Sequence, residues 1–297
     1  MPQHAPGSKR RRKLVIATAA GLALTAGIGF SLADACAAPT TTTTTATPDA
    51  TKAARPHAVQ LPTPNMAFDY QIGQAYTPPA GVKAVSRDHD ASPAKGLYNV
   101  CYVNAFQAQD ADYAKVWDKH SDLLLHRNGK VVKDPDWNEA LLDTSTAAKR
   151  SALMAIIGPW IDGCAAHGFQ AVEPDNLDSY QRSHGLLTAS DAVAFAQLIS
   201  RRAHADGLAA AQKNTTELLG QRATMGFDFA VSEECGAQDT DECAQFASAY
   251  GNRVFDVEYS ASGFATACRK HGAALSIVRR DLDVTAPGSK SYVYRSC

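Results

Sequence analysis

Short apolar runs recur along most of this chain and alternate with amphipathic stretches, and this alternation restricts the folds that the chain can adopt. Several of the runs are apolar at almost every position. Such strands are typical of parallel sheets, in which both faces are buried. We therefore expect strands over residues 68–73, 82–87, 97–104, 139–143, 169–174, 208–213, 227–233, 253–258 and 273–279.

Helices are predicted between the strands by apolar residues at helical spacing. One helix face, spaced i, i+3, i+4, i+7, is formed by Leu153, Ile156, Ile157, Trp160, Ile161 and Cys164. Pro159 lies within this stretch, and we expect a break or kink there because proline lacks an amide hydrogen and clashes with the preceding turn. Thr188 and Asp191 are spaced as a capping box, which predicts a helix reaching about Ala205 and ending at Gly207.

Strands that alternate with helices predict an α/β fold. We expect residues 66–297 to form a single (β/α)8 TIM-type barrel. A doubly wound open sheet is the competing arrangement. The sequence contains neither GxGxxG nor GxxxxGK[ST], the loops with which such sheets bind dinucleotides and phosphates. The barrel is therefore favoured, and no cofactor is expected.

The N-terminal part of the chain does not fit a folded core. Residues 9–13 are all basic, residues 14–30 carry no charge, and residues 33–35 (ADA) form a small-x-small cleavage signal. Together they indicate a secretory signal peptide over residues 1–35. An uncleaved membrane anchor is the alternative, but the apolar stretch is short for a bilayer span. Residues 36–65 are rich in threonine, proline and alanine and indicate a flexible or glycosylated linker.

Export would change the charge of the chain. The sequence has 29 Lys and Arg against 30 Asp and Glu, and the signal segment removes five bases and one acid, which leaves a net charge of about −5. An acidic, secreted or surface-associated domain is no candidate for nucleic acid and tolerates a cationic partner. Lipidation of Cys36 stays open, although Ala33 stands where a lipid-attachment signal has leucine.

Export also permits disulfides among the remaining cysteines. The pairs that we expect are Cys235–Cys243 and Cys268–Cys297. The first pair flanks a short polar loop, and the second would fasten the C-terminus. Cys101 and Cys164 lie in apolar runs, and we expect each to be a small buried hydrophobic residue. No cysteine and histidine spacing matches a zinc site, so no metal is expected.

Polar residues stand at the C-terminal end of nearly every expected strand. In a parallel barrel these ends meet on one face, where active sites are built. The stretch QAVEPDNLDSY, residues 170–180, has three carboxylates within six residues; they are costly to bury, so we place them in a hydrated mouth shared with Lys213. The strand-end residues are Asp69, Gln71, Arg87, Asp88, Tyr102, Asn104, Asp143, Glu173, Asp175, Asn176, Lys213, Asn214, Glu233, Glu258 and Tyr259.

Several of these residues also have a purely structural interpretation. Asp178 would then cap the turn after its strand, and Glu173 and Glu258 would each pair with a nearby cation. Tyr180 and Tyr259 would be packing residues, although exposed aromatic rings beside a cleft of acids often stack on sugars.

The stretches GFQAVEPDNLDSY, GLAAAQKN, FDFAVSEEC and VFDVEY occur in this order. With them the chain resembles glycoside hydrolase family 114, the endo-α-1,4-polygalactosaminidases, whose signature is close to G-x-x-x-V-E-P-D-N-x-D-x-Y. The resemblance spans about residues 68–279 and is looser in its first half, at FDYQIG and YNVCYVNAF. It implies a TIM-like barrel in a secreted or surface-bound enzyme. It places the family's paired catalytic carboxylates at Asp175 and Glu233.

Glycoside cleavage requires one carboxylic acid that protonates the leaving oxygen and one carboxylate at the anomeric carbon. We expect Asp175 to be the nucleophile and Glu233 the acid/base of a retaining reaction, with Lys213 orienting Asp175. The two carboxyl groups should then lie about 5–5.5 Å apart, against about 6.5–9.5 Å in inverting enzymes. The general acid must hold its proton near neutral pH, through burial or a neighbouring negative charge.

The substrate that the resemblance implies is a polysaccharide containing galactosamine. An unacetylated amine carries an ammonium charge, which acids beyond the catalytic pair would attract. Loops after the second and third strands depart from the family pattern, so the accepted sugar stays open. The residues expected to contact substrate are Asp69, Gln71, Asp88, Tyr102, Asp143, Glu173, Asn176, Asp178, Tyr180, Lys213, Asn214, Glu258 and Tyr259.

Three other functions remain as alternatives. They are a non-catalytic carbohydrate-binding barrel at the cell surface, a glycosidase acting on another α-linked polymer, and a metal-dependent hydrolase. No histidine accompanies the acids, which disfavours a transition-metal site. The expected partner is thus a polysaccharide, without nucleic acid and without a stable membrane span after cleavage. The sequence does not define the oligomeric state, and a monomer is favoured.

Overall fold

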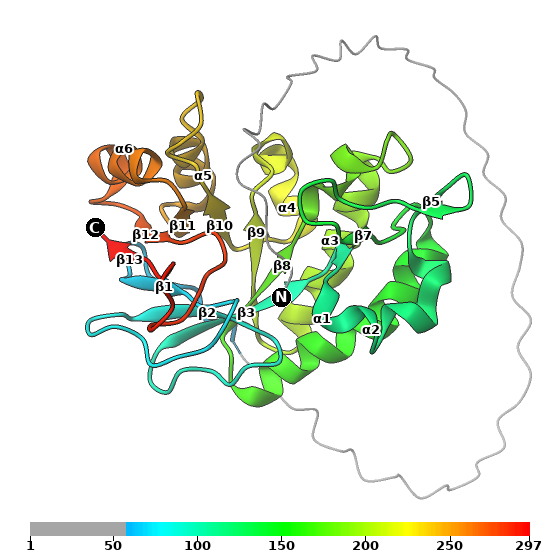
Figure 1. Cartoon of the computed structure of the whole chain (residues 1–297), viewed down its shortest axis with the longest axis horizontal. Coiled ribbons are helices and arrows are strands. Elements are labelled where there is room, and N and C mark those ends of the chain that lie inside the picture. The colour runs from blue at the N-terminus through cyan, green and yellow to red at the C-terminus, as the bar shows by residue number, and fades with distance from the viewer. Residues whose placement is uncertain (1–57) are drawn as a thin grey trace, which may run out of the picture. The chain divides into compact units, whose positions relative to one another are not determined.

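The computed structural model describes residues 58–297, which are organised around a nine-stranded sheet that curls into a nearly closed barrel (Figure 1). Eight strands are parallel and follow one another around the sheet in chain order. They are β1 Phe68–Tyr70, β2 Ala84–Asp88, β3 Tyr98–Asn104, β8 Ala171–Asp175, β9 Ala209–Lys213, β10 Phe229–Glu233, β11 Val254–Glu258 and β12 Ser276–Arg280. The expected TIM-type barrel is confirmed.

The seam of the barrel is closed by a short extra strand and by side chains. β13 Tyr294–Ser296 runs antiparallel beside β12. Nη1 of Arg280 lies 3.1 Å from Oδ1 of Asp69, and both side chains are fully buried. This ion pair joins β12 to β1, the first and last parallel strands.

The strand expected over residues 139–143 is wrong as a barrel strand. Only β7 Ala140–Leu141 forms there, and it pairs antiparallel with β4 Gln107–Ala108 outside the barrel. Its apolar residues are buried within an excursion of the chain, residues 105–146, which lies between β3 and the next long helix. The excursion also contains α1 Asp110–Tyr113, the 3-10 helix η1 Trp117–Leu123, β5 His126–Arg127 and β6 Lys130–Val131.

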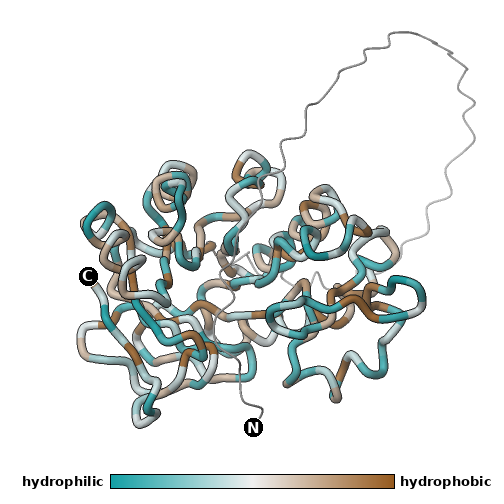
Figure 2. Tube along the Cα trace, turned by 45° about the horizontal axis from the view of Figure 1, so that its top comes forward, coloured by the Kyte–Doolittle hydropathy of each residue, from teal (hydrophilic) through white to brown (hydrophobic). Residues whose placement is uncertain are grey.

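Helices lie outside the second half of the barrel, whereas loops connect β1 to β2 and β2 to β3 in the described chain (Figure 1). The helices mix hydrophobic and hydrophilic residues along their length (Figure 2), as expected for elements buried on one face. They are α2 Ala147–His167, η2 Leu177–Arg182, α3 Ala189–Ala205, η3 Thr216–Gln221, α4 Arg222–Met225, α5 Glu242–Tyr250 and α6 Ala261–His271.

A break or kink was predicted at Pro159, and the break is wrong, because α2 continues through this residue. Leu153, Ile157 and Ile161 are fully buried on either side of it. Their packing outweighs the loss of one backbone hydrogen bond. The predicted capping box of α3 is confirmed, since Asp191 N donates to the Thr188 hydroxyl and the Asp191 carboxylate accepts from Thr188 N.

In β3 and in β8 to β12, successive residues belong to two separate core clusters. One fills the barrel interior and contains Phe68, Ala84, Val100, Ala171, Ala209, Ala211, Phe229, Val231, Phe255 and Val257. The other packs beneath the helices and contains Cys101, Val103, Val172, Ala210, Ala230 and Val254. Because side chains alternate along a strand, this register decides which strand-end residues face the mouth of the barrel.

Three disulfides cross-link the described chain. The expected pairs Cys235–Cys243 and Cys268–Cys297 are both present. The third bond joins Cys101 to Cys164, so the expectation of two separate buried thiols is wrong. One of these residues lies on the outer face of β3 and the other on the buried face of α2, which places them side by side.

The end of the expected linker lies against the barrel. The Gln60 carbonyl accepts a hydrogen bond from the Tyr98 hydroxyl at 2.8 Å, and Val59 packs against the interior cluster. The expected signal peptide and the rest of the linker lie outside the described residues. From residue 58 onward, no helix combines the length and apolar composition needed to cross a membrane.

Candidate active site

Lys213, the last residue of β9, lies between three carboxylates. Its Nζ is 2.9 Å from Oε1 of Glu173, 3.2 Å from Oδ1 of Asp175 and 3.6 Å from Oε2 of Glu233. Glu173 and Asp175 belong to β8 and Glu233 ends β10, the two neighbours of β9 in the sheet. The register turns all four side chains toward the barrel interior, so the structure brings these four candidates together.

Exposure divides this group into two pairs. The side chains of Asp175 and Glu233 keep 16% and 26% of their surface accessible, against 1% for Lys213 and 0% for Glu173. Asp175 and Glu233 can therefore touch a substrate. Lys213 and Glu173 lie beneath them and support them.

Glu173 is held by two residues that the strand-end argument did not select. The hydroxyl of Tyr70 donates to its Oε1 at 2.8 Å, and that of Ser86 donates to its Oε2 at 2.6 Å. Burial raises the pKa of Glu173, and the positive charge of Lys213 offsets part of that rise. Tyr70 and Ser86 have the interior register of Phe68 and Ala84, and that alternation is the signal that would have found them.

Lys213 is the cation of the site. Burial lowers its pKa, but the charges of Asp175, Glu233 and Glu173 outweigh burial, and the net pKa is raised well above the usual lysine value. The amine therefore stays protonated. One ammonium group balances part of the negative charge of three carboxylates.

Asp175 is fixed through both carboxylate oxygens. Tyr102 donates its hydroxyl to Oδ2 at 2.7 Å, and the backbone N–H of Asn176 donates to Oδ1 at 2.7 Å. Burial raises the pKa of Tyr102, and the charge of Asp175 raises it further. Tyr102 thus remains a neutral hydrogen-bond donor.

Glu233 has an equivalent set of partners. Tyr259 donates to Oε1 at 2.5 Å, and the Asn214 side chain donates to Oε2 at 2.9 Å. The side-chain Oδ1 of Asn214 also accepts from the Glu233 backbone N–H at 2.7 Å. Burial and the neighbouring Glu233 raise the pKa of Tyr259 well above its usual range, so this phenol also stays a donor.

Three adjacent strands end in a left-handed residue. Asn176, Asn214 and Glu234 follow β8, β9 and β10 with φ values of 66°, 49° and 58°. Asparagine tolerates this region better than most residues, whereas glutamate does so at a cost of about 1–3 kcal/mol. Such strain is held in place by surrounding contacts and is common at functional sites.

The distance between the catalytic candidates is bounded by their contacts with Lys213. The Oδ1 of Asp175 and the Oε2 of Glu233 cannot be farther apart than 3.2 Å and 3.6 Å placed end to end. This limit on one pair of oxygens is compatible with the carboxyl separation of about 5–5.5 Å in retaining enzymes.

Three candidates of the segment 173–180 (EPDNLDSY) pair with other side chains. Asp178 forms two hydrogen bonds of 2.8 Å with Arg182, which also lies 2.5 Å from Asp134. The hydroxyl of Tyr180 donates to Glu217 at 3.1 Å. Asn176 donates its side-chain amide to Oδ1 of Asn104 at 3.0 Å.

Three other candidates have the opposite register and lie outside the barrel interior. Asp69 pairs with Arg280, and Gln71 accepts from Arg87 Nε at 2.9 Å. Glu258 accepts from the backbone N–H of Gly236 at 2.6 Å. All three candidates are fully buried.

The two remaining acidic candidates lie in loops or at loop boundaries. Asp88 keeps 24% of its side chain exposed at the end of β2, and burial raises its pKa. Asp143 accepts from the backbone N–H and the hydroxyl of Ser145 at 3.1 Å and 2.5 Å. Asp143 therefore belongs to a local turn of the excursion.

Glu139 is a site neighbour that the sequence did not reveal. Its Oε2 accepts from the Asn104 side chain at 2.8 Å, and Asn104 in turn contacts Asn176 beside Asp175. Burial raises the pKa of Glu139 to about 7, and the charge of Asp175 contributes. Glu139 precedes a two-residue strand outside the barrel, so strand-end reasoning had no signal for it.

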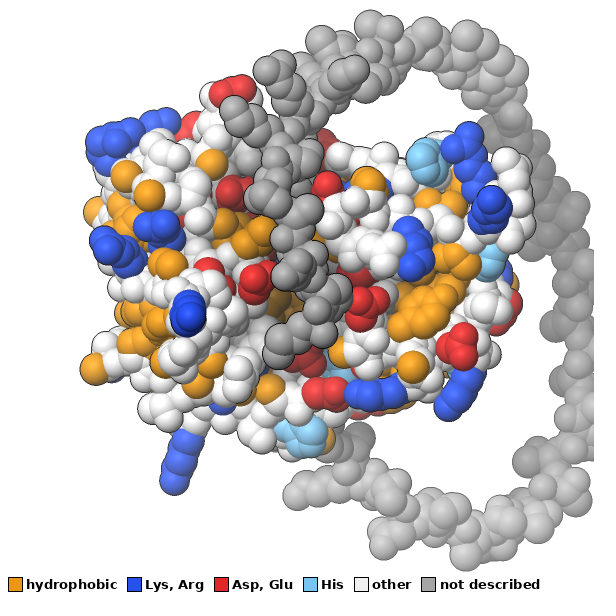
Figure 3. Space-filling view, viewed as in Figure 1, with side chains coloured by type: hydrophobic (Ala, Val, Ile, Leu, Met, Phe, Trp, Pro, Cys, Tyr) orange, Lys and Arg blue, Asp and Glu red, His pale blue; other side chains and the backbone are white. Residues whose placement is uncertain are grey.

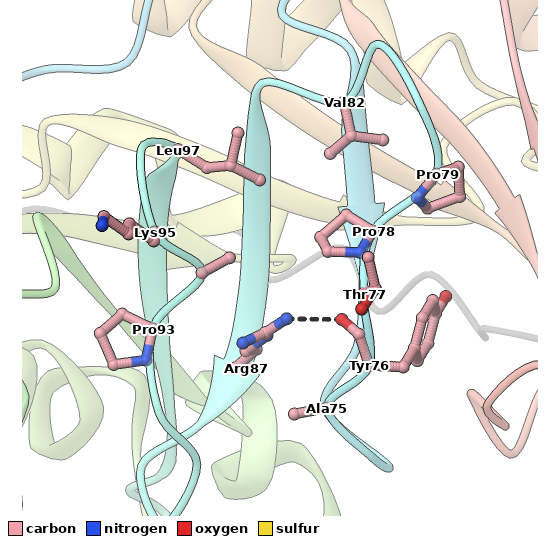
Figure 4. Close-up of a pocket in the computed structure, with 11 residues that line it drawn as sticks. Ala75, Tyr76, Thr77, Pro78, Pro79, Val82, Arg87, Pro93, Lys95 and Leu97 are labelled. Atoms are coloured by element: carbon pink, nitrogen blue, oxygen red, sulfur yellow. Dashed lines mark hydrogen bonds between the residues drawn. The ribbon is translucent and has the colours of Figure 1, made fainter.

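A separate hollow of about 550 Å³ lies beside β2, between residues 75–79 and 93–97 (Figure 4). Its polar wall is Arg87, which donates to the carbonyls of Tyr76 at 2.6 Å and Ser92 at 2.7 Å. It contains no carboxylate and is distinct from the cluster around Lys213.

Charged side chains are unevenly distributed over one face of the molecule. Acidic side chains lie on both sides of its middle, and basic side chains stand mostly toward its rim (Figure 3).

Two groups of residues of metal-ligand type occur in residues 58–297, namely Cys235, Cys243 and Asp256, and Asp241, Cys243 and His271. Both need a cysteine that is bound in a disulfide and has no thiolate to offer.

A parallel barrel whose strand ends hold two partly exposed carboxylates over a buried cation is the architecture of a glycoside hydrolase. The comparison with protein families agrees with this class. The chain belongs to glycoside-hydrolase family GH114, whose model matches residues 48–297.

Two solved structures share the fold. Ega3 of Aspergillus fumigatus, crystallised with galactosamine, superposes with a TM-score of 0.64 at 21% identity, over 81% of this chain and 98% of its own. The glycoside hydrolase domain of PelA from Pseudomonas aeruginosa superposes with a TM-score of 0.54 at 16% identity, over 79% of this chain and 99% of the PelA domain. No curated protein sequence matches the chain.

Proposed function

We propose that this protein is a secreted or surface-associated endo-acting glycoside hydrolase that cleaves α-1,4-linked, galactosamine-containing polysaccharide with retention of configuration. The observation that carries the proposal is the placement of Asp175 and Glu233 on either side of Lys213 at the mouth of the barrel. The galactosamine in the Ega3 structure supports an amino sugar as substrate. Three disulfides support an oxidising compartment.

In the first step, Oδ1 or Oδ2 of Asp175 attacks the anomeric carbon while Glu233 gives its proton to the departing glycosidic oxygen. The C–O bond to the leaving sugar breaks, and a glycosyl ester with Asp175 forms. In the second step Glu233 removes a proton from water, and the water oxygen displaces Asp175. Two inversions at one carbon give net retention.

The supporting residues suit these roles. Lys213 and Tyr102 bind Asp175 and orient it toward the anomeric carbon. Tyr259 and Asn214 fix the direction of the Glu233 carboxyl group. The transition state is oxocarbenium-like and positively charged, so the surplus negative charge around Lys213 stabilises it.

An ammonium group on the sugar would be attracted to the same surplus of negative charge. Beyond the catalytic pair, Glu139 and Asp88 are partly buried acids near the mouth-facing ends of β3 and β2. A neutral α-linked polymer would have no cationic group to pair with these two additional acids. The proposal therefore favours a partly or fully deacetylated galactosamine polymer.

The test is hydrolysis of α-1,4-galactosaminogalactan and of its deacetylated form by the purified protein, with products sized and their first anomer followed by NMR. Asp175→Asn and Glu233→Gln should each reduce kcat by at least about 10³-fold, and Asp143→Asn should retain activity as the matched carboxyl-to-amide control. An initial product of inverted configuration would refute retention. Equal activity on a neutral α-linked polymer would refute the substrate.

Azide separates the two roles. With an activated substrate, azide should restore turnover to alanine variants of either residue. The variant that lacks the nucleophile should give the β-glycosyl azide, because azide displaces the leaving group in a single inversion. The variant that lacks the acid/base should give the α-glycosyl azide, because the reaction still passes through the glycosyl ester and inverts twice. We expect the β product from Asp175→Ala and the α product from Glu233→Ala. The reverse outcome would exchange the roles.

A further inference from the structure

Two carboxylic acids of β11, Asp256 and Glu258, are fully buried on the helix side of the sheet. They are two residues apart on one strand, so their side chains project from the same face. Ser232 donates its hydroxyl to Oδ1 of Asp256 at 2.9 Å. The backbone N–H of Gly236 donates to Oε1 of Glu258 at 2.6 Å. Both partners flank Glu233 in the chain.

The second oxygen of each acid has no donor. Oδ2 of Asp256 and Oε2 of Glu258 are buried and have no hydrogen-bond partner within residues 58–297. Ionised carboxylates only accept hydrogen bonds, so two anions here would leave both oxygens unsatisfied and repel each other. A single proton between them satisfies both oxygens.

We propose that Asp256 and Glu258 share one proton and that this hydrogen-bonded pair positions the loop of residues 234–237, and with it Glu233. The inference rests on the proposed function in so far as Glu233 is the acid/base. Asp256 and Glu258 are positioning residues, since neither reaches the substrate.

The pair acts on Glu233 from two sides. Ser232 and Gly236, which it binds, lie immediately before and three residues after Glu233. Tyr259 directly follows Glu258 and donates its hydroxyl to Glu233 at 2.5 Å. A displacement of the pair would therefore move both the Glu233 backbone and its hydrogen-bond donor.

Close packing seals the pair from water. A Cβ added to Gly263 of α6 would clash with Oε2 of Glu258, and one added to Gly236 would lie 2.6 Å from the Gly263 carbonyl. α6 therefore contributes bare backbone at this point. From α5, Cys243 faces the pair in its disulfide with Cys235 and cannot titrate.

The charges around the pair favour the shared proton. Burial raises the pKa of both acids. The negative charge of Asp256, and then that of Glu234, raises the pKa of Glu258 further, and that of Glu233 raises the pKa of Asp256. Glu258 accordingly holds the proton, and Asp256 accepts the hydrogen bond.

The experiment compares the wild type with Glu258→Gln and Glu258→Leu in thermal unfolding and kcat between pH 5 and 10. In the wild type, Tm and kcat should fall together as alkaline pH removes the proton. Glu258→Gln can donate its amide to Asp256 and accept from Gly236, so its kcat at pH 6 should stay within about threefold of wild type. The falls in Tm and kcat at alkaline pH should be smaller in Glu258→Gln than in the wild type. Glu258→Leu should lose at least about tenfold in kcat at every pH.

Thermal unfolding in an Asp175→Asn background separates this inference from the proposed function, because it needs no turnover. There too, Glu258→Gln should flatten the alkaline fall in Tm. A wild-type Tm independent of pH up to 10, or a Glu258→Gln variant with the wild-type profile, would overturn the shared proton. A Glu258→Gln variant with flattened Tm but strongly reduced kcat at pH 6 would overturn the positioning role.

Discussion

The hydroxyl of Tyr102 donates a 2.7 Å hydrogen bond to Oδ2 of Asp175. On the other side of Lys213, Tyr259 donates to Glu233 in the same way. Each of the two proposed catalytic carboxylates thus has its own phenol donor, and both donors remain neutral because burial raises their pKa. Asp175 and Glu233 nevertheless keep part of their side-chain surface exposed.

Removal of the Tyr259 hydroxyl should lower kcat with little change in stability. Tyr259 orients the Glu233 carboxyl group, and a misplaced reacting group can cost about 10²-fold in rate, so Tyr259→Phe should reduce kcat about 10–100-fold. The ring that remains preserves packing, and Tm should shift by less than about 3 °C. Tyr98→Phe is the matched control, because the hydroxyl of Tyr98 donates to the Gln60 carbonyl away from the carboxylates. Equal losses in the two variants would contradict a special role for Tyr259.

Replacement of Lys213 by methionine should damage both stability and turnover. It leaves the fully buried Glu173 without its cation, and the loss of one partner of a buried pair costs about 3–5 kcal/mol. Steady-state kinetics should show at least about a 10²-fold lower kcat. Lys290→Met, at an exposed position, is the control.

The double variant Lys213→Met with Glu173→Gln separates the two effects. It removes the uncompensated buried charge and should recover most of the unfolding free energy, without recovering kcat. Recovery of turnover in this variant would show that Lys213 serves only to neutralise Glu173.

Local sequence signals predicted eight barrel strands and the segments that carry Asp175, Lys213 and Glu233. Apolar runs of strand length specify buried parallel strands, and the polar residues that follow them must lie at the barrel mouth. These conclusions need only neighbouring residues, which a sequence supplies directly.

The local signals did not reveal the register of each strand, that is, which of its residues face the barrel interior. Asp69, Gln71 and Glu258 lie near strand ends but face outward, whereas Tyr70 and Ser86 face inward and bind Glu173. The interior register could have been read from the period-two alternation. It was obscured because the outer face of a barrel is also buried, so both registers are apolar.

Contacts between distant segments were not readable at all. The excursion that buries residues 139–143 pairs β4 with β7, and the bond from Cys101 to Cys164 joins residues separated by 63 positions. Neither follows from local pattern. Likewise, α2 continues through Pro159 because tertiary packing holds it on the barrel.

Glu139 should make stability depend on pH. Its folded pKa of about 7 exceeds the ordinary 4.5, so the native state binds the proton more tightly than the unfolded chain does. The contribution of Glu139 to stability is then greatest below pH 4.5 and falls as pH rises toward 7, by at most about 3 kcal/mol. Urea unfolding at several pH values should show this fall reduced in Glu139→Gln. Parallel curves for both proteins would contradict the prediction.

Two of the disulfides should differ in their contributions to stability and to turnover. Cys101–Cys164 spans 63 residues and Cys235–Cys243 spans 8, and longer closed loops restrict the unfolded chain more strongly. Replacing Cys101 and Cys164 by alanine should cost about 2–4 kcal/mol in urea unfolding and leave kcat nearly unchanged. The Cys235 and Cys243 double variant should cost less stability but lower kcat, because this bond fastens the loop after Glu233. The opposite ranking in unfolding would contradict the loop-length argument.

Added salt should weaken hydrolysis of the deacetylated polymer selectively. Its ammonium groups are drawn to acids around the barrel mouth, such as Asp88 and Glu139, and salt screens charges separated by more than about 10 Å at 0.1 M. Between low salt and 0.5 M, kcat/KM should fall on the order of tenfold for the deacetylated polymer, whereas fully acetylated polymer should be almost unaffected. Asp88→Asn should reduce this salt dependence and Asp143→Asn should not, since Asp143 is engaged in a turn with Ser145. An equal salt response of both polymers would show that amine charge does not contribute to recognition.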